Sequence, residues 1–93
     1  MTDTQTQLEW EASARKKYDE MLTKIPLFHR QIAKQVVEKK APLNARDRQA
    51  SLIEEEDIVR AFLTEVPAAF YSLMIRLMDE VGFDYKKYEE DSE

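Results

Sequence analysis

The stretch Lys24-Ile25-Pro26-Leu27-Phe28-His29-Arg30 separates two helical patterns in this chain. Pro26 cannot lie inside a helix without removing a backbone donor, but its fixed φ suits the first turn of a new helix. We therefore expect one helix to end before Pro26 and another to begin there. Apolar side chains then recur every four residues, which predicts a row facing the core. This predicted core row consists of Phe28, Ile32 and Val36, widened by Ala33 and Val37.

Another apolar stripe lies upstream of this stretch. Between residues 7 and 22, apolar side chains are spaced by four, four and three residues, which places them on one face of a helix. We expect this face to contact the core. The stripe consists of Trp10, Ala14, Tyr18 and Met21.

The helix that begins near Pro26 is predicted to end at Ala41-Pro42. A residue that precedes proline is disfavoured in helical geometry, and proline lacks the backbone donor that a helix interior needs. Residues 43–50 are mostly polar and show no regular apolar repeat. We therefore expect a polar loop over residues 43–50.

Two further helical patterns follow this loop. Ser51 stands three residues before Glu54, the spacing of a capping box, and the acidic residues 54–57 suit the positive end of a helix dipole. Gly82 directly follows the last pattern, where a left-handed stop residue is favoured. The third helix carries Ile58, Val59, Phe62, Leu63 and Val66, and the fourth carries Phe70, Leu73, Met74, Leu77, Met78 and Val81.

These patterns predict an all-α fold, a compact bundle of about four helices with a polar loop between the second and the third. A chain of 93 residues forms one domain, and one glycine with three prolines argues against a turn-rich β architecture. We expect a disordered N-terminal tail over residues 1–6, a single helical domain over residues 7–88 and an acidic disordered tail over residues 89–93.

The composition excludes several kinds of site within this chain. Without cysteine it cannot form disulfides, thiolate metal sites or cysteine-ligated iron–sulfur clusters. It has one histidine and no glycine-rich phosphate loop or activated nucleophile motif, so we expect no catalytic residue, cofactor or metal in the chain by itself. Neither a secretory leader pattern nor a long apolar span is present, which predicts a cytoplasmic protein without a membrane segment.

Charge is distributed unevenly along the chain. Residues 24–48 carry seven Lys or Arg and two Asp or Glu, whereas residues 49–93 carry four and twelve. Either the two segments attract each other within the fold, or the basic segment forms a docking surface for an acidic protein partner. A sequence pI near 4.9 argues against nucleic-acid binding.

Four side chains of the second helix are candidate partner-binding residues. The planar guanidinium of Arg30 suits a carboxylate on another molecule, although an internal ion pair with the acidic part of the chain would also use it. His29 fits a partly exposed helix position, a binding contact, or an acid–base or axial ligand. The candidate partner-binding residues are Arg30, Lys34, His29 and Glu38, and the candidate structural residues are Trp10, Pro26, Phe28 and Ile53.

The fourth helix carries apolar side chains beyond its main stripe. Tyr71 and Ile75 lie off that stripe, and an apolar set this wide predicts burial on more than one side. A homodimer is therefore an alternative to a different protein partner.

The same residues also carry a family resemblance. In type and spacing, residues 10–62 resemble the small helical domain at the carboxyl end of the B subunit of light-independent protochlorophyllide reductase. Two features depart from that family: it usually has an aliphatic residue at the position of His29, and its loop is shorter and contains glycine. The resemblance is carried by Trp10, Ala14, Met21, residues 25–30, Val37, Glu38, Ala41, Ile53, Glu55 or Asp57, and Ala61.

In that family, large nitrogenase-like domains build the iron–sulfur cluster and the substrate cavity, and this chain has no counterpart to those domains. The resemblance therefore implies an accessory module that docks on, or regulates, a larger redox assembly. Arg30 and Glu38 are the polar residues that it matches.

A different class of protein shares part of this pattern. Residues 57–62, after a long helix and a loop, resemble a histone-fold protein, which would be a dimer with a protein or DNA partner. The predicted break at Pro42 and the acidic balance of the chain weigh against this alternative.

Overall fold

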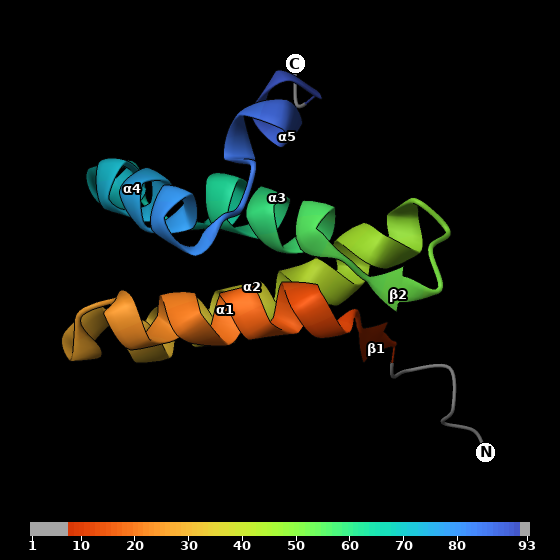
Figure 1. Ribbon diagram of the computed structural model, residues 1–93, viewed down its shortest axis with the longest axis horizontal. Helices are drawn as coiled ribbons and strands as arrows, with labels where there is room; N and C mark the ends of the chain where they lie inside the picture. The colour runs from red at the N-terminus through yellow and green to blue at the C-terminus, as the bar shows by residue number, and fades with distance from the viewer. Residues whose placement is uncertain (1–7, 92–93) are drawn as a thin grey trace.

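The computed structural model describes residues 8–91, so the tail predicted at residues 1–6 lies outside the described range. About 78% of the described residues are helical, which confirms the all-α prediction. In Figure 1, α1 and α2 form one layer, α3 and α4 form a second layer above it, and α5 lies across α3. The order is β1 (Glu9–Trp10), α1 (Ala12–Lys24), α2 (Leu27–Asp47), β2 (Leu52–Ile53), α3 (Glu55–Glu65), the 3₁₀ helix η2 (Ala68–Phe70), α4 (Tyr71–Val81) and α5 (Tyr85–Asp91).

Helix α1 places its apolar stripe in the core. Ala14, Tyr18 and Met21 are buried, as their spacing predicts. Trp10 precedes the helix and lies in β1, where its ring stacks on Tyr18 with centroids 5.4 Å apart. Helix α1 begins at a cap in which the Glu11 carboxylate accepts a hydrogen bond of 2.8 Å from the Ala14 amide.

Helix α2 turns a different row toward the core from the one that we predicted. The buried row is Ala33, Val37, Ala41 and Ala45, whereas Phe28 is 85% exposed and Ile32 is 56% exposed. The prediction that Phe28 is a core residue is therefore wrong. Small side chains on the inner row let α2 pack closely against α3, and the bulky row remains on the outside. A helix with two apolar rows does not reveal by its spacing which row faces inward.

Helix α2 also continues through Pro42 to Asp47, so the predicted loop over residues 43–50 is largely helical. Tertiary contacts account for this difference, because Ala41 and Ala45 on either side of Pro42 are both buried. Packing of this kind overrides the local cost of an interior proline. The helix ends beyond Asp47 in a Schellman motif, in which the Ala50 amide donates to the Ala45 carbonyl and Gln49 has a positive φ of 60°.

A short parallel bridge that the sequence pattern did not indicate ties the N-terminal segment to the start of α3. In it, Glu9 pairs with Leu52 and Trp10 pairs with Ile53. Ile53 is buried, as expected for a structural residue. The N-cap of helix α3 is Glu54 and not Ser51, because the capping box is formed by Glu54 and Asp57.

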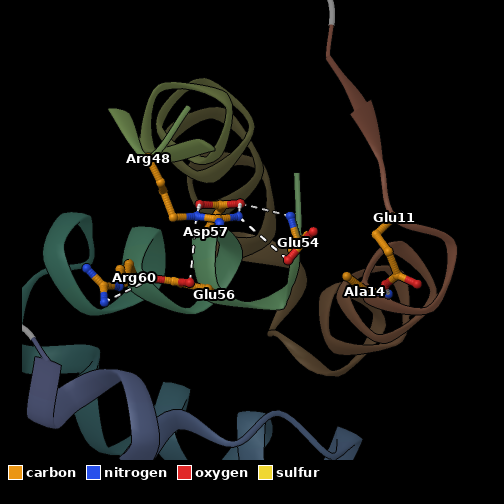
Figure 2. A network of polar contacts seen from close by, with 7 residues as sticks. All are labelled: Glu11, Ala14, Arg48, Glu54, Glu56, Asp57 and Arg60. Carbon is orange, nitrogen blue, oxygen red and sulfur yellow. Dashed lines mark hydrogen bonds and ion pairs between the residues drawn. The ribbon is translucent and has the colours of Figure 1, made fainter. Parts of the chain in front are cut away.

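An ion pair between a partly exposed arginine and a buried aspartate joins the end of α2 to the start of α3. Asp57 is fully buried, and both of its oxygens accept from Arg48, at 2.9 Å from Nε and 2.7 Å from the terminal nitrogen. The Glu54 amide donates to the same carboxylate at 2.8 Å. Figure 2 shows Arg48 in the middle of this network, with Glu56 linking it to Arg60. The hydrogen bond from Arg48 to Asp57 raises the pKa of Arg48 above its usual value.

Helix α4 ends as predicted at Gly82, which has a φ of 94°. Its buried residues are Met74, Leu77 and Met78. Lys17 fixes the following turn, because its ammonium group donates to the Glu55 carboxylate at 3.0 Å and to the Gly82 carbonyl at 3.2 Å. Helix α5 runs to Asp91, so the tail predicted at residues 89–93 begins inside a helix, and residues 92–93 lie outside the described range.

Alkaline pH is expected to destabilise the fold through Tyr18. Burial, together with the nearby Glu38 carboxylate, raises the pKa of Tyr18 above its usual value of 10.0. Above that pH the unfolded chain loses the Tyr18 proton while the folded chain keeps it. The free energy of unfolding should therefore fall by about 1.4 kcal/mol per pH unit because of this group.

Urea unfolding followed across this pH range measures the effect. The variant Tyr18→Phe should lose this part of the slope, whereas Tyr85→Phe, which removes a half-buried hydroxyl on α5, should keep it. Equal slopes in the wild type and Tyr18→Phe would contradict the expectation.

Candidate functional site: an apolar pocket and stripe beside α2

Large apolar side chains are exposed at the start of α2. Leu27 is 74% exposed, in addition to the exposed Phe28 and Ile32 described above. Phe28 and Ile32 lie one helical turn apart on the same side, whereas Leu27 points about 100° away from Phe28. Adjacent exposed apolar side chains mark an interaction surface more often than isolated ones do.

An apolar pocket of about 90 Å³ lies beside these side chains. One wall belongs to the N-terminal half of α2, and the other belongs to the end of α3, the connection to α4 and the first turn of α4. His29 and Glu65 are the lining residues with ionisable side chains. The volume suits one apolar side chain, since an engineered cavity of about 150 Å³ holds benzene. The other lining residues include Ile32, Ala33, Val36, Val66, Phe70 and Met74.

The exposed row of α2 continues beyond the pocket. Val36 is half-buried and follows Ile32 by four residues, and Leu43 is 43% exposed and follows seven residues later. We call Phe28, Ile32, Val36 and Leu43 the outer stripe. It extends for about 22 Å along the helix. The exposed Lys39 lies on the same side, seven residues after Ile32 and four before Leu43.

His29 is the predicted partner-binding residue that lines the pocket. Its ring lies 4.4 Å from the Phe70 ring and 5.3 Å from the Phe28 ring, measured between centroids. These contacts make the half-buried imidazole part of an aromatic wall. Its ring therefore bridges the pocket and the outer stripe.

Arg30 forms intramolecular contacts that we did not predict. It binds backbone carbonyls, whereas we expected a carboxylate of a partner or of its own chain. Its guanidinium donates to the Ile25 carbonyl at 3.0 and 3.3 Å and to the Thr23 carbonyl at 3.2 Å. These carbonyls belong to the C-terminal end of α1, where a cation and extra donors are stabilising. Arg30 therefore fixes the angle between α1 and α2, and a partner contact through it stays a prediction.

The remaining two candidates lie away from the pocket. Lys34 is exposed and about 200° around the helix from Ile32. Glu38 accepts a hydrogen bond of 3.0 Å from the Tyr18 hydroxyl. The structure therefore does not bring the four predicted residues together. Sequence reasoning missed Val66, Phe70 and Lys39, and the presence of two apolar rows on α2 was the signal that could have indicated the outer stripe.

The basic and acidic parts of the chain meet at some points and not at others. Arg48 pairs with Asp57, and Lys24 lies 3.6 Å from Glu80. Within residues 8–91, the side chains of Lys34, Lys39 and Lys40 form no hydrogen bond or ion pair. Part of the positive charge of residues 24–48 is therefore left facing solvent along α2.

The pocket and the outer stripe are lined mainly by apolar side chains. Among the residues that the structure describes, no group of three His, Cys, Asp or Glu side chains is arranged to hold a metal. In the same part of the chain no single helix has the length and apolar composition of a membrane span, although α3 with Ala68–Val81 meets both criteria as a pair bent by 119°. The apolar pocket and the outer stripe are suited to holding apolar side chains of another molecule.

One family model matches this chain. It is described as a protein of unknown function, DUF2621, and it matches residues 3–91. No curated protein and no solved structure matches.

Proposed function

The chain belongs to the DUF2621 family, and we propose that it is a non-catalytic docking module that binds an amphipathic helix of a partner protein. The observation that carries this proposal is the outer stripe next to the apolar pocket. Phe28 and Ile32 are exposed, although eighteen other hydrophobic residues in the described part of the chain are buried. A protein partner would remove this apolar surface from water.

The shape of the site favours a helix as the bound segment. The outer stripe follows one helix, and its length of about 22 Å corresponds to four turns. An amphipathic helix binds an apolar surface through apolar side chains that recur at intervals of three and four residues. One of these side chains would enter the pocket between His29 and Phe70, and its neighbours would cover Phe28 and Ile32. Full burial of each large apolar side chain contributes about 1.5–3 kcal/mol.

Charge favours a different protein over a second copy of this chain. The side of α2 that carries the outer stripe includes Lys39, which has no ion-pair partner among residues 8–91, and presents no carboxylate between Phe28 and Leu43. Two α2 helices packed on each other would bring like charges together, which costs stability in proportion to their approach. An acidic partner gains from the same charges.

The resemblance to the reductase domain suggests a narrower partner, a subunit of a nitrogenase-like redox assembly. That suggestion rests on residues 10–62 of the sequence and stays a prediction.

The structure bears on the histone-fold alternative in two ways. Helix α2 is not broken at Pro42, which removes one objection, but Tyr18, Met21 and Phe62 are fully buried within one chain, so a second chain is not needed to close the core.

Site-specific photo-crosslinking in the native cells tests the proposal. A crosslinking amino acid at position 32 should give a discrete adduct with one partner protein, identified by mass spectrometry. The matched control is position 34, which is also exposed on α2 but lies about 200° away from Ile32. With the purified partner, Phe28→Ser should weaken binding by about 10- to 100-fold, because it removes one large apolar contact.

Two results would overturn the proposal. One is an adduct between two copies of this chain, together with a dimer in sedimentation experiments that Phe28→Ser converts to a monomer. The other is the same set of adducts from positions 32 and 34.

A further inference from the structure

The apolar pocket is lined by two aromatic rings that lie in contact with each other. His29 on α2 and Phe70 in η2 line it from opposite walls, with ring centroids 4.4 Å apart and ring planes inclined by 51°. We call them the pocket rings. Both side chains are half-buried, so part of each ring remains uncovered. The buried Met74 on α4 lines the same pocket, so a thioether side chain adjoins the two rings.

The backbone holds both pocket rings in place. Each ring stands three residues after a proline, and its amide donates to the carbonyl of that proline, at 2.8 Å from His29 to Pro26 and at 2.9 Å from Phe70 to Pro67. The fixed φ of proline restricts the two turns further. A site that is ordered before binding loses less conformational entropy when a ligand enters. The contacts that the pocket rings offer are therefore preformed.

We infer that the side chain by which the partner helix enters this pocket is aromatic. This inference rests on the proposed docking function and names the chemistry of its anchor. Aromatic rings pair offset or edge to face, and such pairs contribute affinity beyond the area that they bury. The sulfur of a methionine also makes favourable contacts with the edge of a ring. An aliphatic anchor would bury a similar area and gain neither contribution.

The size of the pocket places part of this anchor at the mouth. A cavity of about 150 Å³ holds benzene, so a pocket of about 90 Å³ takes in only part of a ring. The rest of the ring would lie beside Ile32, which lines the pocket and is 56% exposed. His29 precedes Ile32 by about one turn of α2. A ring in this position would therefore contact the pocket rings and the outer stripe together.

Two blocked amino acids test the inference on the intact chain without the partner. The first is N-acetyl-phenylalanine amide. The second is N-acetyl-cyclohexylalanine amide, which has a saturated ring of nearly the same size and a larger apolar surface, so hydrophobic burial alone predicts that it binds more tightly. We expect a Kd of about 1 mM for each probe, with the phenylalanine probe at least about twofold tighter. NMR titrations that follow the methyl groups of Met74 and Ile32 measure both constants at the pocket.

Two matched variants identify the source of this preference. Phe70→Leu removes one of the pocket rings and keeps an apolar side chain, so the cyclohexyl probe should then bind as tightly as the phenylalanine probe or more tightly. Phe28→Leu makes the same change at an 85% exposed ring that does not line the pocket, and it should leave the preference unchanged. Thermal melts of both variants check that the fold is retained.

Three results would overturn the aromatic anchor. In the first, the cyclohexyl probe binds the wild type at least as tightly as the phenylalanine probe, which would leave the pocket as a site for any apolar side chain and the docking function intact. In the second, Phe70→Leu keeps the preference or Phe28→Leu loses it, so that the pocket rings are not its cause. In the third, neither probe binds, and the crosslinking experiment then decides the docking function separately.

Discussion

Replacing Arg48 by methionine is expected to cost about 3–5 kcal/mol of unfolding free energy, because it leaves a buried carboxylate without its counter-ion. Asp57 is fully buried and receives both of its side-chain ion-pair hydrogen bonds from Arg48. Methionine keeps much of the length and packing of the arginine side chain but offers no donor. The network also joins the end of α2 to the start of α3, so its loss would loosen the start of α3.

Urea or thermal unfolding of four variants measures this effect: Arg48→Met, Asp57→Asn, the double variant and a control. The control is Arg15→Met, which breaks the exposed pair between Arg15 and Asp19 at 3.2 Å and should cost less than about 1 kcal/mol. The double variant Arg48→Met with Asp57→Asn should cost less than the sum of the two single variants, because it leaves no uncompensated buried charge. If Arg48→Met were no more destabilising than Arg15→Met, the ion pair would not be a main support of the fold.

A second large effect is expected for Phe62→Ala, about 3–5 kcal/mol. Phe62 is fully buried at the centre of α3, and its ring lies 6.1 Å from that of Tyr18. Truncation would leave a cavity that the surrounding helices fill only in part. For a domain of this size that loss is a large fraction of the total stability.

The matched variant is Phe28→Ala, the same change at a position that is 85% exposed. It should change the unfolding free energy by no more than about 0.5 kcal/mol. Parallel melts of the two variants decide between the core row predicted from the sequence and the row found in the structure. A similar loss in both variants would show that Phe28 is packed in the folded protein.

The orientation of α2 is the main difference between what could be predicted for the candidate site and what the structure contains. Phe28, Ile32 and Val36 were correctly grouped on one side of a helix, because helical spacing is a local property of the chain. Their assignment to the core failed because Ala33, Val37, Ala41 and Ala45 form a competing row of smaller side chains. The choice between the rows depends on how closely α2 can approach α3, and neither helix specifies that alone.

Pro42 and the pocket illustrate the same limit. The local preference of Ala41-Pro42 is to end a helix, yet buried contacts at Ala41 and Ala45 hold α2 together on both sides of the proline. The pocket is lined by His29 on α2 and by Phe70 beyond α3. The spacing of Arg48 and Asp57 in the sequence likewise does not predict that they form an ion pair. Of the predicted binding residues, Arg30 and Glu38 instead bond within the chain.

The sequence by itself determined the helical class of the protein, the buried stripe of α1, the start of α2 at Pro26 and the end of α4 at Gly82, because spacing, proline geometry and a left-handed glycine act over a few residues. Only the tertiary structure decided which side of α2 is buried, that α2 passes through Pro42, that β1 pairs with β2, and that an apolar pocket lies beside exposed Phe28 and Ile32. These features depend on contacts between distant segments, whose free energies exceed the local preferences that a sequence pattern reports.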